Sequence, residues 1–281
     1  MDLNLIQNFI NLALAEDVGD GDHTSLATIP AEAKGKAKLL VKEAGILAGA
    51  ELALQIFHTV DADLQINTLL QDGVSIQPGD IVFYVEGSAQ SILKAERLVL
   101  NCMQRMSGIA TKTNEIVQLI AGSGVKLLDT RKTTPGMRYL EKWAVRIGGG
   151  VNHRFGLYDM ILIKDNHVDY AGGIKQAIKE ARQYLKDQQK NLQIEIEVRN
   201  MQELQQVLDE GGADRIMLDN FSVPQLKEAV ELINKKYITE ASGGITSENI
   251  AEYATTGVDY ISSGALTHSV KSLDLSLKAV Q

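Results

Sequence analysis

The sequence has 281 residues, a length that allows one large domain or two ordinary ones, and its 44% apolar and 23% charged residues argue against disorder. Its 28 Lys and Arg residues against 36 Asp and Glu give a net charge of −8, which argues against a general nucleic-acid or acidic-membrane surface. No apolar run approaches the roughly 18 residues of a membrane helix. A single cysteine, Cys102, and an N-terminus without the basic start of a secretory signal favour a reducing cytoplasm.

The first part of the chain predicts a small domain of helices and antiparallel strands. A helix is expected over 3–15, strands over 36–42 and 81–85, and a longer helix over 91–106, with turns at Asp72-Gly73 and Pro78-Gly79-Asp80. One stripe of the longer helix is polar and comprises Arg97, Asn101, Gln104 and Arg105. The wide opposite face is apolar and comprises Ile92, Ala95, Leu98, Val99, Cys102, Met103 and Met106. We expect Ser107-Gly108 to end this helix and to mark a domain boundary.

The rest of the chain predicts alternating strands and helices. Short β-rich runs cover 125–128, 160–163, 193–198, 215–218, 237–239 and 259–262. Each of the last four runs begins 22 residues after the one before it. Helices fit between these runs over 201–210, 223–234 and 247–255. The residues that cap them are Asn200, Ser222 and Thr246. Strands that alternate with helices at short, regular spacing imply βα units and a parallel sheet.

Polar residues after the strands favour a barrel over a doubly wound sheet. They follow all six strands, at 129–132, 164–167, 197–199, 219–220, 240–244 and 263–265. A doubly wound sheet concentrates its site near one switch point, whereas a barrel collects residues from many strand ends at one face. Six strands are fewer than eight, so we expect either an incomplete barrel or further strands that the pattern does not reveal.

Five cations gather near the ends of the first two barrel strands, although the protein is acidic overall. They are Arg131, Lys132, His153, Arg154 and Lys164. A solvated face with ion pairs would explain any one of them, but five at one barrel mouth fit a small, multiply anionic substrate. Charge-assisted hydrogen bonds to a carboxylate contribute about 1.5–3 kcal/mol each.

Glycine loops follow the last two strands, at Ser242-Gly243-Gly244 and Ser263-Gly264-Ala265. Barrels commonly bind phosphate at this place, on backbone N–H groups. Ordinary βα turns have the same composition, but the pairing at consecutive strand ends favours a phosphate site.

Two carboxylates, Glu197 and Asp219, end adjacent strands and are 22 residues apart. They could bind Mg²⁺ on a phosphorylated substrate, act as general acid or base, or neutralise the nearby cations. The residues alone therefore indicate a barrel enzyme with a polyanion site and a phosphate site, and they do not name a reaction.

Longer stretches of the chain resemble one family, quinolinate phosphoribosyltransferase, also called nicotinate-nucleotide pyrophosphorylase (carboxylating). The resemblance covers nearly the whole chain and includes 13–22 with Thr24-Ser25, and 96–101 with 107–111. The most specific stretches, all in family order, are Asp129-Thr130-Arg131-Lys132-Thr133-Thr134-Pro135-Gly136, Gly148-Gly149-Gly150 with Asn152-His153-Arg154, and Lys164-Asp165-Asn166-His167.

The resemblance implies roles for these residues. The quinolinate carboxylates would be bound by Arg131, Lys132, Arg154 and Lys164, with His153 nearby, and by Arg97 from a neighbouring subunit. Glu197 and Asp219 would face the ribose, pyrophosphate and Mg²⁺ of phosphoribosyl pyrophosphate, and the 5′-phosphate would lie on Ser242, Gly243 and Gly264. Lys132, Glu197 and Asp219 would be the catalytic residues.

The resemblance also implies the fold and the reaction. It implies an open, TIM-like α/β barrel over 108–267 and an N-terminal α/β sandwich domain over 1–107 that is completed by 268–281. It also implies a homodimer or higher homo-oligomer that works in the cytoplasm. The enzyme would transfer the phosphoribosyl group to quinolinate with decarboxylation, giving nicotinate mononucleotide, pyrophosphate and CO₂ in de novo NAD biosynthesis. Its cofactor would be Mg²⁺, and neither nucleic acid nor a membrane would be a partner.

Three alternative functions compete with this one. A molybdenum-associated paralogue is close in sequence, but the retained His153-Arg154 and Arg131-Lys132 pairs argue against it. A barrel lyase that forms a Schiff base on Lys164 or Lys132 belongs to a different enzyme class. A non-enzymatic protein that binds a phosphate ligand is the third.

Overall fold

The computed structural model, which describes residues 3–280, divides the chain into two compact units. The first unit combines the residues up to 114 with 133–149 and with those from 266 onward. The second unit comprises 115–132 and 150–265. Each unit is therefore assembled from separate stretches of the chain.

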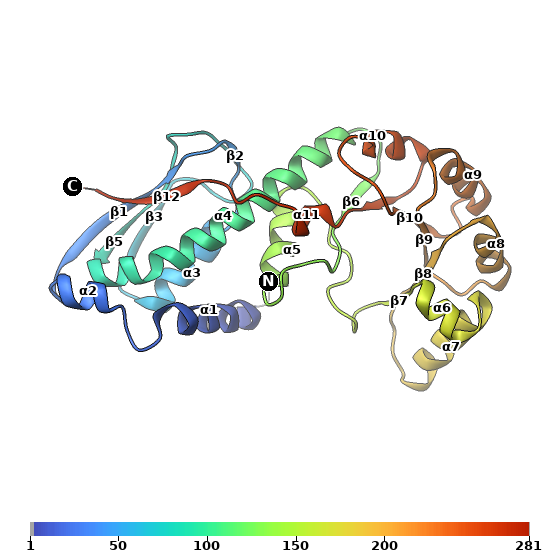
Figure 1. The fold of residues 1–281 in the computed structure, drawn as a ribbon, viewed down its shortest axis with the longest axis horizontal. Coiled ribbons are helices and arrows are strands. Elements are labelled where there is room, and N and C mark those ends of the chain that lie inside the picture. Colours follow the sequence, from blue (N-terminus) through green and yellow to red (C-terminus); the bar gives the residue numbers. More distant parts are fainter. Residues whose placement is uncertain (1–2, 281) are drawn as a thin grey trace. The chain divides into compact units, whose positions relative to one another are not determined.

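The first unit contains a four-stranded antiparallel sheet in the order β12-β1-β5-β3. The strands are β1 (Lys34–Val41), β3 (Gln65–Thr68), β5 (Ile81–Ser88) and β12 (Leu275–Ala279), and a separate ladder joins β2 (Gly45–Ile46) to β4 (Ser75–Ile76). The C-terminal strand β12 pairs along β1, as Figure 1 shows. The predicted antiparallel strands are confirmed, and so are the turns, because Gly73 and Gly79 have φ of 93° and 100°.

Five helices accompany this sheet. They are α1 (Leu3–Val18), α2 (His23–Thr28), α3 (Ala50–Val60), α4 (Ala89–Leu119) and α5 (Arg138–Ile147). Phe57 of α3 packs edge-on against Phe83 of β5, with ring centroids 5.8 Å apart. The predicted apolar face of the long helix is confirmed, because all seven of its residues are buried. Burial of this face accounts for the position of α4 in the first unit.

The expected end of the long helix at Ser107-Gly108 is wrong, since α4 continues to Leu119. Gly108 lies where the chain comes close to itself: a Cβ on this residue would clash with the carbonyl oxygen of Lys271. The hydroxyl of Ser107 donates to the carbonyl of Ala48 at 3.1 Å and accepts from its backbone N–H at 2.9 Å. The pair therefore serves close packing inside the first unit, which a pattern of helix-ending residues does not reveal.

We predict that Gly108→Ala destabilises the protein, because the added methyl group meets a backbone carbonyl that has little freedom to move. Overpacking of this kind costs about 1–3 kcal/mol. The midpoint of thermal unfolding, measured by circular dichroism, should fall by several degrees. Asn101→Ala on an exposed position of the same helix is the control and should leave the midpoint nearly unchanged. An unchanged midpoint for Gly108→Ala would contradict the close approach to Lys271.

The second unit contains a six-stranded parallel sheet in the order β6-β11-β10-β9-β8-β7. Its strands are β6 (Lys126–Leu128), β7 (Ile161–Ile163), β8 (Ile194–Val198), β9 (Arg215–Asp219), β10 (Ile238–Ser242) and β11 (Tyr260–Ser262). All six predicted strands are confirmed. The first strand pairs with the last, but β6 and β7 share no ladder among the described residues. The sheet is therefore an open barrel, as expected from the strand count.

Helices follow the barrel strands, and Figure 1 shows α7, α8 and α9 along the outer side of β8 to β10. The helices are α6 (Asp165–Ala171), α7 (Ile174–Asp187), α8 (Met201–Glu210), α9 (Val223–Ile233), α10 (Ile250–Tyr253), the 3₁₀ turn η1 (Ala254–Thr256) and α11 (Ala265–His268). The predicted caps of α8 and α9 are confirmed: Asn200 accepts from the backbone of Glu203 at 2.9 Å, and Ser222 forms a capping box with Gln225.

The helix expected over 247–255 is shorter than predicted. Thr246 makes the expected cap contact, since its hydroxyl accepts from the backbone N–H of Glu248 at 3.3 Å, but a turn over 247–249 follows it and α10 begins only at Ile250. The side chain of Asn249 accepts from the backbone of Thr246 at 2.8 Å. This reciprocal pair of contacts between Thr246 and the residues after it stabilises the turn that leads into α10.

Candidate functional site

Side chains of the barrel strands form two polar layers inside the second unit. Residues two apart on a strand point to the same side, and inward-facing residues of neighbouring strands lie in layers. The layer at the carboxyl ends comprises Glu197, Asp219 and Ser242. The layer below it, on the same side of β8, β9 and β10, contains Glu195 and Arg215, which are paired in the register, and Glu240, which pairs with Met217. The sequence predicted the first layer and missed the second.

The five expected cations all belong to the second unit. Arg131 and Lys132 follow β6, Lys164 follows β7, and His153 and Arg154 lie in a loop next to the end of β6. That loop is placed by Val151, which forms a parallel bridge with Leu128. The barrel topology therefore gathers these groups at the carboxyl ends of its strands.

Two of the cations, Arg131 and Arg154, are close enough to repel one another. Burial, and then the charge of Arg131, lower the pKa of the Arg154 guanidinium. The Nε of Arg131 is buried and has no hydrogen-bond partner among the described residues. Arg154 donates through Nη1 to the carbonyl of Met160 at 3.2 Å, which fixes its position. Two half-buried guanidinium groups in this arrangement fit an anion with more than one carboxylate.

The loop that carries Arg154 is attached to the barrel by a buried carboxylate. Asp129, which directly follows β6, is fully buried. It accepts from the side chain of Asn152 at 2.6 Å and from the backbone N–H of His153 at 2.8 Å. The backbone N–H of Arg154 then donates to Nδ1 of His153 at 2.7 Å. Each residue of the Asn152-His153-Arg154 motif is thus hydrogen-bonded to a neighbour.

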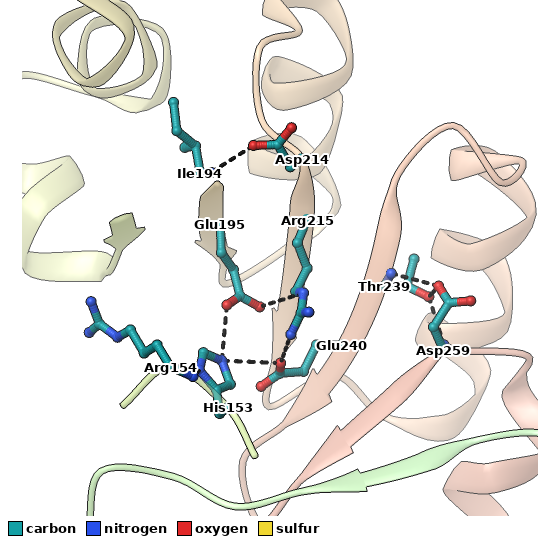
Figure 2. Close-up of polar contacts among 9 residues, drawn as sticks. All are labelled: His153, Arg154, Ile194, Glu195, Asp214, Arg215, Thr239, Glu240 and Asp259. Carbon is teal, nitrogen blue, oxygen red and sulfur yellow. Dashed lines mark hydrogen bonds and ion pairs between the residues drawn. The ribbon is translucent and has the colours of Figure 1, made fainter. Parts of the chain in front are cut away.

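His153 points into the barrel rather than out of it, as Figure 2 shows. Its Nε2 lies 3.0 Å from a carboxylate oxygen of Glu195 and 3.3 Å from one of Glu240. Arg215 approaches both acids, at 3.9 Å from Glu195 and 3.3 Å from Glu240. The side chains of both acids are fully buried, and that of His153 is 6% exposed. We call these four residues the buried tetrad.

Charge and burial oppose each other in the buried tetrad. Burial lowers the pKa of His153, the two carboxylates raise it, and the N–H of Arg154 donated to Nδ1 favours the neutral ring. Burial and then the charge of Glu240 raise the pKa of Glu195 to about 7. The pKa of Glu240 is lowered, because the contacts with His153 outweigh its burial. The backbone N–H of Arg154 donates to Nδ1 at 2.7 Å, which requires a lone pair there, so the ring is neutral and carries its proton on Nε2, facing the carboxylates.

The carboxylates expected at the strand ends, Glu197 and Asp219, lie close together. Glu197 is 9% exposed, and burial followed by the charge of Asp219 raises its pKa, while Lys164 opposes this shift. The carboxylate of Asp219 accepts from the side chain of Asn220 at 2.6 Å. Two neighbouring acids of this kind are stabilised by a cation, since each raises the cost of ionising the other.

The expected phosphate loops follow β10 and β11. Gly243 has a φ of 87°, and a Cβ there would clash with both the backbone and the side chain of Asn220, so only glycine fits. The backbone N–H of Asn220 donates to the carbonyl of Ser242 at 2.8 Å, and Gly264 directly precedes α11. After the first loop, α10 begins only at Ile250.

Arg97 stands apart from the other expected site residues. It lies on α4 in the first unit and is exposed, whereas the others belong to the second unit. Sequence reasoning assigned no role to Asp129, which anchors the loop, or to Glu195, Arg215 and Glu240 inside the barrel. Their signal was present: charges alternate with apolar residues inside the strands that carry them, as in Glu195-Ile196-Glu197.

Among the described residues, one group could hold a metal ion: the ligand atoms of His153, Glu195 and Glu240 lie within 4.8 Å of one another. It differs from the pair that the sequence predicts for Mg²⁺. Arg215 lies 3.9 Å from Glu195 and 3.3 Å from Glu240, so the positive charge next to these acids comes from the protein itself. No helix within residues 3–280 has the length and apolar character to cross a membrane.

An open barrel with guanidinium groups, paired acids and glycine loops at one end defines the class of barrel enzymes that act on small anionic, phosphorylated substrates. Known proteins identify the family. The sequence matches "Quinolinate phosphoribosyl transferase, N-terminal domain" over residues 22–107 and "Quinolinate phosphoribosyl transferase, C-terminal domain" over residues 109–278. This chain belongs to the quinolinate phosphoribosyltransferase family, as its motifs predicted.

Individual relatives agree with this assignment. The chain is 49% identical to the mitochondrial quinolinate phosphoribosyltransferase [decarboxylating] 2b of Nicotiana tabacum, over 97% of this chain and 82% of that protein. It is 44% identical to the probable nicotinate-nucleotide pyrophosphorylase [carboxylating] of Bacillus subtilis, over 97% and 92%. The crystal structure of NadC from Streptococcus pyogenes superposes with a TM-score of 0.93 at 38% identity, over 100% of this chain and 99% of that one. These relatives do not favour the paralogue, the Schiff-base lyase or the binding protein.

Proposed function

We propose that this chain transfers the phosphoribosyl group of phosphoribosyl pyrophosphate to quinolinate, with loss of CO₂, at the carboxyl ends of its barrel strands. The family's curated members are named for this activity. The observation that carries the location is the pair Arg131 and Arg154, two guanidinium groups that repel one another in a protein of net charge −8. Such a pair is costly by itself and is stabilised by a dianion such as quinolinate.

Quinolinate has two adjacent carboxylates, and each needs its own cationic partner. Arg131 and Arg154 suit them best, since a guanidinium offers a planar fork of donors. Lys164 and Lys132 are exposed at neighbouring strand ends and add point charges. His153 lies next to Arg154 in the chain, with its Nε2 directed to Glu195 and Glu240. Its contribution is therefore to the position of Arg154.

We expect Arg131→Ala and Arg154→Ala each to weaken quinolinate binding at least tenfold, because each removes a charged hydrogen-bond partner worth about 1.5–3 kcal/mol. Isothermal titration calorimetry without phosphoribosyl pyrophosphate measures the Kd directly. Arg199→Ala is a matched control, since this arginine also follows a barrel strand but is exposed and paired with Asp169 and Glu203. Unchanged quinolinate affinity in both test variants would overturn the assignment of the anion site.

Glu197 and Asp219 fit a divalent cation. The charge of Asp219 and burial both raise the pKa of Glu197, so this pair gains stability from a nearby positive charge. Mg²⁺ prefers carboxylate oxygens together with the phosphates of its ligand, and when bound it would neutralise the pyrophosphate as negative charge develops there. These two acids would hold it, directly or through water.

The chemistry then follows from positioning and charge. The pyridine nitrogen of quinolinate attacks C1 of the ribose, and the bond from C1 to pyrophosphate breaks. Positive charge develops on the ribose, facing Glu197 and Asp219, and Lys132 stabilises the leaving pyrophosphate. Ser242, Gly243 and Gly264 bind the 5′-phosphate. The pyridinium then accepts the electron pair of the bond to the 2-carboxylate, CO₂ leaves, and C2 takes a proton from water to give nicotinate mononucleotide.

Assembly and location complete the proposal. Arg97 completes the quinolinate site of a neighbouring subunit, so the functional unit is at least a homodimer. The protein works in a reducing cytoplasm, which agrees with one buried cysteine whose pKa is raised to about 12 by burial. Several plant relatives are named mitochondrial or chloroplastic. Cell fractionation tests the location, and recovery of the protein in an organelle would contradict it.

A single assay tests the proposed function. Quinolinate labelled in its 2-carboxylate should release labelled CO₂ only when phosphoribosyl pyrophosphate and Mg²⁺ are both present. Omission of either should abolish release. If no label is released under any of these conditions by folded protein, the proposed function is wrong.

A further inference from the structure

The buried tetrad has no part in the reaction as described above, yet it places two carboxylates, a guanidinium and an imidazole inside the barrel. Both acid side chains are fully buried, and the exposed fractions of His153 and Arg215 are 6% and 13%. Burial of charged groups is expensive, and a buried ion pair often stabilises a protein less than apolar residues of the same size would. A purpose other than stability is therefore the better explanation for this cluster.

The contacts of the tetrad lead to the proposed anion site in two steps. Nε2 of His153 faces Glu195 and Glu240, and Nδ1 on the other side of the ring accepts from the backbone N–H of Arg154. The carboxylates attract the ring proton to Nε2, and this leaves the lone pair of Nδ1 for Arg154. A second proton on Nδ1 would break that hydrogen bond.

Figure 2 shows how the parts are arranged. Glu195 and Glu240 come from β8 and β10, Arg215 comes from β9 between them, and the ring of His153 lies against both acids, while the side chain of Arg154 extends away from them. Glu195 also acts on Arg154 through its charge. Since the three strands are rigid elements, the position of the ring is fixed by the barrel and not by its own loop.

We propose that Glu195, Arg215 and Glu240 are positioning residues for quinolinate binding: they fix the orientation of the His153 ring, and the ring fixes the backbone of Arg154. This inference rests on the proposed function, because Arg154 is its point of contact with the substrate. Arg215 keeps both acids charged and in place, so that one guanidinium serves two carboxylates. The upper layer, Glu197 and Asp219, is not part of this device.

The test compares isosteric and truncating variants of the two acids. Glu240→Gln and Glu195→Gln keep the shape and lose the charge, whereas Glu240→Ala and Glu195→Ala remove the contact with His153. We expect the quinolinate Kd to rise about tenfold or more in the alanine variants and less in the glutamine variants, as for the loss or weakening of one charge-assisted hydrogen bond. The Kd of phosphoribosyl pyrophosphate should stay within about twofold of the wild type, because its site lies on other residues.

Asp259→Asn is the matched control. This carboxylate is also in the barrel unit, but it accepts from the backbone and the hydroxyl of Thr239 at 2.8 Å, near the start of β10, away from His153. It should lower the midpoint of thermal unfolding and leave the quinolinate Kd unchanged. If the alanine variants do not fold, the glutamine variants decide the question.

Histidine ¹⁵N spectra provide a second test, because a merely structural role of the acids would leave the tautomer of His153 unchanged. The signal of His153 is assigned by its loss in the His153→Gln variant. In the wild type it should report the tautomer with hydrogen on Nε2. The Glu240→Gln substitution should shift this signal. The inference is wrong if all four acid variants bind quinolinate like the wild type, or if both substrates weaken together in proportion to the loss of thermal stability. If the wild type itself does not bind quinolinate, the proposed function fails instead.

Discussion

Replacing Asp219 by Asn and Glu197 by Gln should lower kcat about a hundredfold or more in each case and leave quinolinate binding intact. Both changes keep the shape of the side chain and remove negative charge that faces the ribose as it becomes positive. Electrostatic groups of this kind typically contribute 10²–10³ to kcat, or about 2.7–4 kcal/mol. Steady-state kinetics with saturating substrates and Mg²⁺ measures kcat, and calorimetry without phosphoribosyl pyrophosphate measures the quinolinate Kd.

A carboxylate at the opposite end of the same strands provides the control for this experiment. Asp214 directly precedes β9, and its side chain accepts from the backbone of Ile194 at 2.7 Å. Asp214→Asn should affect thermal stability and leave kcat nearly unchanged. If both test variants retain a normal kcat and a normal dependence on Mg²⁺, then Glu197 and Asp219 only balance neighbouring charges, and the proposed catalytic role is wrong.

The barrel could be predicted because its signals are local. Each strand of the second unit is a short apolar run, and the spacing of 22 residues between the last four runs leaves room for one helix per strand. The strand positions agree with the prediction to within a few residues, and the caps at Asn200 and Ser222 are those that the sequence indicated. Hydrophobic periodicity and capping are encoded within a few residues of where they act.

The extent of α4 could not be predicted, because the reason for Gly108 lies far away in the chain. A serine and a glycine in succession resemble a helix end, but here the glycine accommodates Lys271, more than 160 residues later. Local patterns carry no information about such a partner. The helix expected after Thr246 is shorter than predicted, since residues 247–249 form a turn and residues 254–256 a 3₁₀ turn on either side of α10.

The buried tetrad marks the limit of the site prediction. His153 was grouped with the cations because of its neighbours in the sequence, but a sequence does not show which way a ring points. Glu195 and Arg215 lie inside predicted strands and Glu240 directly after one, and the sequence pattern assigns none of the three a role. Charged residues at alternate positions in a buried strand, as in Glu195-Ile196-Glu197, indicate a polar barrel interior and should be searched for directly.

The proposal that two subunits share one site predicts the largest effect in this protein. Arg97 lies on an exposed part of the polar stripe of α4 in the first unit, and the anion site lies in the second. If Arg97 completes the site of its partner, Arg97→Ala and Arg131→Ala homodimers should both be nearly inactive. Unfolding the two variants together and refolding them as a mixture should restore activity, because about half of the dimers would be mixed.

The recovered activity has a defined size under two-fold symmetry. In a mixed dimer one site carries both defects and the other carries neither, so about a quarter of all sites in the mixture are intact. Recovery toward a quarter of the wild-type activity supports a shared site. Each variant refolded alone is the control and should stay inactive. Mass spectrometry of the intact dimers establishes that mixed dimers form. If they form and no activity returns, Arg97 acts within its own subunit or outside any site, because only a residue contributed across the two-fold axis is complemented in this way.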